Sequence, residues 1–291
     1  MFYFTARYAT VFAMNDTKFS NIPVKPWRDI DASVLAATKT VPTMLSRQEQ
    51  LLYHWITANW ATGAGAIVEL GCYAGGSTAR LAEGHRLAGL SSTIHAYDRF
   101  GINQHGKDKH LYPAGVEPFE GDDLFPLAKS LLAPWSDRIK LHPGMIEDQK
   151  WSGEDIEVLV MDASKSTRTT DRFAEMFFPY LIPGRSLVVQ QDYLHWKQPW
   201  IAVQMELMAD CFTPVGFAPN DTIVFRCDAR VGPHILTAGK VSNLSPETMI
   251  ETLKAARQRL HALELGNKIN RLLKAAKANP WIERASDMVS P

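Results

Sequence analysis

Three cysteines, no surplus of charge and no long apolar run set the first limits on this sequence. The cysteines stand apart, without a C-x-x-C pair, so we expect no disulfide framework, no zinc cluster and a reducing compartment, the cytoplasm. Lys plus Arg and Asp plus Glu both number 31, a balance that argues against a dedicated nucleic-acid binder. No stretch approaches the roughly 18 apolar residues that cross a bilayer, so we expect no membrane span.

The 291 residues, 46% of them hydrophobic, suffice for one large domain or two small ones. Prolines interrupt residues 1–45, which we interpret as an N-terminal leader with both Met1 and Met14 as candidate translation starts. Charge breaks its opening too early for a signal peptide. Residues 46–229 are expected to form the main domain and residues 230–291 a C-terminal helical extension.

Apolar runs alternate with helical patterns through the expected main domain. The runs predict seven strands, at residues 66–70, 93–97, 139–142, 156–161, 186–189, 212–217 and 222–227. Helices are predicted from Ser46, which opens a capping box, and at residues 77–87, 122–133, 170–181 and 200–209. Such alternation indicates an α/β fold with a doubly wound, mostly parallel sheet and a C-terminal antiparallel hairpin at its edge.

The C-terminal extension carries a further helical pattern. Ser245 and Pro246 suit the cap and the first turn of a helix. Apolar residues then recur at roughly helical intervals from Met249 to Leu272. Two interpretations stay open: a helix docked on its own domain, or an arm for homodimerisation or for another partner.

The segment Val68–Thr78 joins the first predicted strand to the next helix and is rich in glycine. Glycine lets the backbone turn sharply and approach a ligand, and the N-terminus of the following helix favours an anionic group. A dinucleotide fingerprint needs glycine two residues after Gly71, where this chain has Tyr73, and a G-x-x-x-x-G-K phosphate loop is absent. An NAD-dependent oxidoreductase is therefore a disfavoured alternative.

The acid two residues before Gly71, the G-x-x-x-G spacing and an acid at the end of the second strand resemble the class I S-adenosylmethionine-dependent methyltransferases. Residues 71–78 and 183–193 are similar to the bacterial macrocin O-methyltransferase group. The resemblance covers residues 46–228 and implies a Rossmann-like, seven-stranded sheet with S-adenosylmethionine as cofactor. It implies cofactor contacts from Glu69, Gly71, Tyr73, Gly75, Ser77, Asp98, Met145, Ile146 and Asp162.

The same resemblance implies a divalent metal ion, such as Mg²⁺, near the ends of the later strands. Its candidate ligands are Asp162, Gln191 and Asp192, with Gln191 in the place of a carboxylate. Because the site has one negative charge fewer, we expect the metal to be secondary. His195 follows the fifth strand closely, and histidine suits general-base chemistry near neutral pH. His195 and Asp192 are therefore the candidate catalytic residues.

The expected function is methyl transfer to a hydroxyl group of a small molecule or sugar. This acceptor molecule is also the expected binding partner. The alternative from another class is a non-catalytic protein that keeps this fold as a binding or scaffold module. The long connection at residues 99–121 is either an acceptor-binding lid or a solvated loop. Trp196 and Trp200 either stack on the acceptor or anchor the core.

Overall fold

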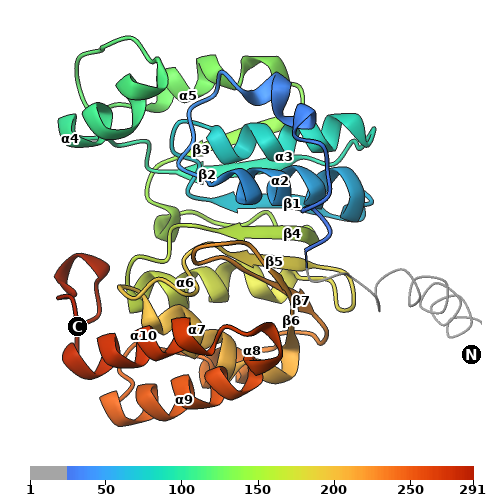
Figure 1. Ribbon diagram of the computed structural model, residues 1–291. Helices are drawn as coiled ribbons and strands as arrows, with labels where there is room; N and C mark the ends of the chain where they lie inside the picture. Colours follow the sequence, from blue (N-terminus) through green and yellow to red (C-terminus); the bar gives the residue numbers. More distant parts are fainter. Residues whose placement is uncertain (1–24) are drawn as a thin grey trace, which may run out of the picture.

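A seven-stranded sheet organises the part of the chain that the computed structural model describes, residues 25–291 (Figure 1). The strands lie in the order β3-β2-β1-β4-β5-β7-β6. Their bounds are β1 Ala66–Leu70, β2 Ile94–Asp98, β3 Ile139–Pro143, β4 Ile156–Met161, β5 Leu187–Gln190, β6 Phe212–Phe217 and β7 Ile223–Cys227. β1 to β5 are parallel, whereas β7 pairs antiparallel with β5 and with β6. The predicted doubly wound, Rossmann-like α/β sheet with a terminal hairpin is confirmed.

Helices cover both faces of the sheet (Figure 1). One face carries α2 Arg47–Trp55, α3 Gly76–Leu87 and α5 Phe125–Leu131, and the other carries α6 Thr167–Phe177, α7 Pro199–Leu207, α8 Pro233–Ala238, α9 Pro246–Arg259 and α10 Gly266–Ala278. Because side chains alternate along a strand, Ile67 of β1 joins the core beneath α2 and α3, while Val68 joins the core beneath α6 and α7. No helix among residues 25–291 is long and apolar enough to cross a membrane.

The helix α2 begins at the predicted capping box. The Ser46 hydroxyl accepts a hydrogen bond from the Glu49 amide at 3.4 Å, and Glu49 Oε2 accepts one from the Ser46 amide at 2.8 Å. The helix then continues as a π-helical turn over Ile56–Trp60. The box satisfies two amides that a helix start otherwise leaves free, and it also fixes the Glu49 carboxylate in the interior.

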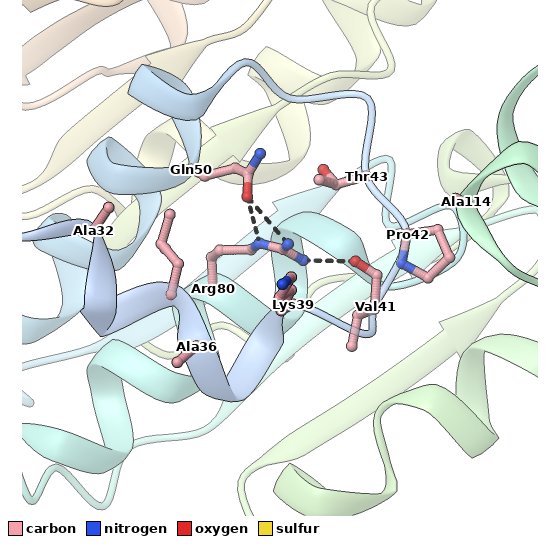
Figure 2. Close-up of a pocket in the computed structure, with 10 residues that line it drawn as sticks. Ala32, Ala36, Lys39, Val41, Pro42, Thr43, Gln50, Arg80 and Ala114 are labelled. Carbon is pink, nitrogen blue, oxygen red and sulfur yellow. Dashed lines mark hydrogen bonds between the residues drawn. The ribbon is translucent and has the colours of Figure 1, made fainter.

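The segment before α2 packs against α3, and Arg80 joins the two (Figure 2). Its guanidinium donates to the carbonyl oxygens of Val41 and Gly76, both at 2.9 Å, and to Gln50 Oε1 at 3.1 and 3.3 Å. Burial lowers the pKa of Arg80 to about 10. A cavity of about 550 Å³ lies beside these groups and is also lined by Thr43. The contacts attach the N-terminal segment to the first turn of α3, at the end of the glycine-rich connection.

The C-terminal extension differs from the single helix that the sequence pattern predicts. Two helices, α9 and α10, lie side by side (Figure 1). The chain reverses between them at Glu264, whose φ of +59° is left-handed, and α10 starts at Gly266. Leu253 and Leu272 belong to the same hydrophobic core as α6 and α7, so the extension docks on its own domain. Dimerisation through it stays a prediction.

Candidate functional site

The connection from β1 to α3 lies where the direction of winding reverses, since β2 and β4 flank β1 on opposite sides. Ligands of open α/β sheets bind outside the carboxyl ends of the strands at such a point. Gly71 and Gly75 have φ angles of +103° and +91°, which side chains rarely tolerate. A Cβ at Gly71 would also lie 3.0 Å from the carbonyl oxygen of Asp162, so glycine lets the end of β1 approach the end of β4.

Asp98 ends β2 and holds this connection in place. One carboxylate oxygen accepts a hydrogen bond from the Tyr73 amide at 2.8 Å, and the other accepts one from the Phe100 amide at 2.6 Å. Tyr73 has a φ of +51°, an uncommon conformation for a residue with a side chain, which the bond to Asp98 supports. Each oxygen has a second lone pair, so the carboxylate keeps capacity for two further donors.

Glu69 lies one residue before the end of β1 and is 1% exposed. Burial, opposed by hydrogen bonds from Ser77 and Thr78 and assisted by the charges of Asp162 and Asp98, raises its pKa to about 7. The Thr78 hydroxyl donates to Glu69 Oε2. The structure therefore brings the predicted acid of β1 together with Ser77, at the first turn of α3.

The pair Met145 and Ile146 follows β3, which runs beside β2 with Pro143 opposite Asp98. The Gly144 amide donates to the carbonyl oxygen of Asp98 at 3.0 Å, so the pair starts next to this acid. Met145 is 48% exposed, whereas Ile146 is buried in the core. Two of the predicted cofactor contacts thus lie beside a third, Asp98, although only Met145 of the pair is available on the surface.

Asp162 and Asp192 follow the neighbouring strands β4 and β5, and the ammonium group of Lys165 lies between them. Lys165 Nζ donates to Asp162 Oδ1 at 3.1 Å and also to Asp192 Oδ2. Burial, assisted by the charge of Asp192 and opposed by Lys165, raises the pKa of Asp162 to about 6. Burial alone would raise the pKa of Asp192, but Lys165 and a hydrogen bond from Gln198 hold it below its usual range.

Gln191 makes its side-chain contacts with α2. Its Nε2 donates to Glu49 Oε1 at 2.7 Å, and its Oε1 accepts from the Tyr53 hydroxyl at 2.9 Å. The Thr222 hydroxyl also donates to Glu49 Oε1, at 2.8 Å. Within residues 25–291 no group of three or more His, Cys, Asp or Glu side chains could hold a metal ion. The residues expected to bind Mg²⁺ are therefore engaged with partners of their own and do not fit that ion.

His195 is half-buried in the turn that follows Asp192, where its amide donates to the Asp192 carbonyl oxygen at 3.0 Å. The Lys197 amide donates to His195 Nδ1 at 3.3 Å. The half-buried Trp196 ring stacks against His195 at a centroid distance of 6.3 Å. Trp200 is fully buried, and its Nε1 donates to the carbonyl oxygen of Ser164 at 3.0 Å. Trp200 therefore anchors the core and is not available to stack on an acceptor.

The long connection after β2 is largely helical. It contains α4 Gln104–Gly106 and two further turns, Lys107–Leu111 and Tyr112–Ala114, and it projects beyond the sheet (Figure 1). The Lys107 ammonium is buried and donates to the carbonyl oxygens of Phe119 at 3.0 Å and Gly121 at 2.6 Å. The segment thus has internal structure, and its role as an acceptor-binding lid stays a prediction.

Sequence reasoning missed Lys165, Glu49 and Tyr53. Lys165 had one local signal, its position three residues after the acid that ends a buried strand. Glu49 was recognised only as part of a capping box. Its contact with Gln191 joins residues 142 positions apart, and no local pattern records such a contact.

No protein-family model matches the sequence, and no curated protein matches it. Solved structures that do match include S-adenosylhomocysteine-bound PaMTH1, a methyltransferase of Podospora anserina, at 14% identity, 91% and 89% coverage of the two chains and a TM-score of 0.37. CalS11, a TDP-rhamnose 3'-O-methyltransferase of calicheamicin biosynthesis, matches at 16% identity, 77% and 96% coverage and a TM-score of 0.48. Cofactor-bound Rv0187 from MTB matches at 15% identity, 76% and 97% coverage and a TM-score of 0.45.

The chain is thus similar to solved methyltransferases over most of its length. The ligands and activities named for those proteins are known for them and not for this chain.

Proposed function

We propose that this protein transfers the methyl group of S-adenosylmethionine to a hydroxyl group of a small molecule or sugar. The observation that carries the proposal is the Asp98 carboxylate, which two backbone amides fix beside the glycine connection at the winding reversal. An acid in this place is suited to accept hydrogen bonds from both hydroxyls of a ribose. The adenosine would then extend toward Met145.

The charges around the connection favour a sulfonium over a dinucleotide. The charges of Asp162 and Asp98 both raise the pKa of Glu69, so these three carboxyl groups lie close together, and Asp192 adds a further carboxylate beyond Lys165. A positively charged sulfonium is attracted to such a group, whereas the pyrophosphate of NAD would be repelled. The N-terminus of α3 has the opposite polarity from these acids. Its free amides suit the carboxylate in the methionine part of S-adenosylmethionine.

Methyl transfer is a displacement in which the C–S bond breaks as the C–O bond forms. S-adenosylmethionine supplies the activated methyl carbon, and the sulfur keeps the electron pair of the broken bond. The hydroxyl proton must leave, and we assign it to His195, as a general base beside the anionic Asp192. Asp192 stays ionised and would stabilise the positive charge that His195 gains.

His195 must present the correct nitrogen for this role. The Lys197 amide donates to Nδ1, which places the hydrogen of a neutral ring on Nε2. Proton uptake at Nε2 therefore requires the other tautomer and the opening of this 3.3 Å contact. The contact is long, so its loss is a small obstacle.

The proposed activity is tested by supplying S-adenosylmethionine with a labelled methyl group together with panels of sugars, nucleotide sugars and phenols. We expect label in at least one acceptor, with little incorporation by the Asp98→Asn variant. If wild-type protein binds the cofactor but labels no acceptor class, the non-catalytic binding module becomes the better interpretation. The three cysteines are buried and unpaired, which supports the cytoplasm as the proposed compartment.

A further inference from the structure

The carboxylates at the ends of β4 and β5 already have a cation between them. Lys165 Nζ donates to one oxygen of Asp162 and to one of Asp192, and both acids follow strands that pair in register, with Met161 opposite Gln190. Gln198 Nε2 donates to the same Asp192 oxygen at 2.8 Å. The ammonium thus has the position that a metal ion bridging the two carboxylates would require.

Gln191, the third candidate metal ligand, makes its side-chain hydrogen bonds with residues of α2. Gln191 donates to Glu49 and accepts from Tyr53, which an amide does with its two ends and an ionised carboxylate, an acceptor only, does not. A carboxylate at position 191 would face that of Glu49 at 2.7 Å, where two negative charges repel. The Glu49 carboxylate, which the capping box holds in place, therefore suits glutamine at position 191 better than an ionised acid.

We propose that Lys165 is a built-in cation that takes the place of a divalent metal ion between Asp162 and Asp192. An ammonium group has three donors, and the carboxylates occupy two of them. The Lys165 side chain is 53% exposed, so the third donor is free to meet an oxygen of a bound molecule. If the proposed methyl transfer is correct, that oxygen belongs to the acceptor, and Lys165 is a positioning residue for it.

Manganese binding tests this proposal without reference to catalysis. Mn²⁺ is added to the full chain, and the signal of the free ion is followed by electron paramagnetic resonance. We expect little binding of Mn²⁺ by wild type at this site, because Lys165 Nζ already donates to both carboxylates and occupies the position between them. Lys165→Met should bind Mn²⁺ about tenfold more tightly or better, since two carboxylates become available to a hard cation. The double variant Lys165→Met/Asp192→Asn should lose this gain.

The matched control is Lys240→Met, which removes a lysine paired with the single carboxylate of Glu175 at 2.8 Å and should create no site. Circular dichroism establishes that each variant is folded, and Lys165→Gln replaces Lys165→Met if the latter is not. The proposal is overturned if wild type binds Mn²⁺ in a manner that Asp192→Asn abolishes. It is equally overturned if a folded Lys165 variant gains no binding. Either result leaves cofactor binding and methyl transfer to be judged by their own assays.

Discussion

Replacing Asp98 with asparagine tests the residue on which the proposed cofactor site depends. The Asp98 carboxylate accepts amide hydrogen bonds at 2.8 and 2.6 Å, from Tyr73 and Phe100. Asparagine keeps one acceptor oxygen but turns an NH₂ group toward the other amide. One amide then loses its partner, which costs about 1–3 kcal/mol of folding stability.

The loss in binding is separate from this loss in stability. Hydrogen bonds to a charged group contribute about 1.5–3 kcal/mol, so losing the carboxylate should weaken S-adenosylmethionine binding about 10- to 150-fold. Calorimetric titration measures the affinity, and thermal unfolding measures the stability. Asp137→Asn, at an exposed acid paired with Arg138, is the control and should alter neither cofactor affinity nor site geometry. Unchanged affinity in Asp98→Asn would refute the role assigned to this carboxylate.

Three further predictions concern charge, catalysis and stability. Because burial raises the pKa of Glu69 to about 7 and that of Asp162 to about 6, both acids ionise as pH rises from 5.5 to 8. Over that range, affinity for cationic S-adenosylmethionine should increase more than affinity for neutral S-adenosylhomocysteine; parallel pH profiles in calorimetry would contradict this. His195→Ala should lower the single-turnover rate by about two to four orders of magnitude with cofactor affinity retained, and a nearly active variant would remove His195 as the base. Arg80→Met should cost at least about 2 kcal/mol in urea unfolding, because buried acceptors lose a charged donor. The exposed Arg257→Met should cost within about 0.5 kcal/mol, and equal losses would show that the Arg80 contacts do not stabilise the fold.

The sheet and the glycine connection could be predicted because their signals are local. Apolar runs such as residues 156–161 indicate a strand that is buried on both faces of the sheet. Gly71 and Gly75 indicate backbone angles that other residues avoid. The positions of Asp98 and Asp162 at strand ends then follow, since carboxyl ends of parallel strands meet at one edge of the sheet.

Contacts between distant segments could not be predicted in this way. The lysine that joins Asp162 to Asp192 is visible only once β4 and β5 are paired in register. The reversal before α10 escaped detection because apolar spacing continues through Leu260 and Leu263, and Gly266 alone marks the new start. Trp200 shows a further limit of prediction from sequence. A tryptophan suits both burial in the core and stacking on a ligand, and only the structure shows that Trp200 is buried.

The central claim, that this connection holds S-adenosylmethionine, is tested most directly by one calorimetric comparison of ligands. Wild-type protein is titrated with S-adenosylmethionine, with its demethylated product and with NAD. The account predicts saturable binding of the first two and none of NAD, because Tyr73 stands where a dinucleotide-binding turn has glycine and the acids around Glu69 repel a pyrophosphate. Clear binding of NAD, with no heat from S-adenosylmethionine or its product, would contradict the cofactor assignment.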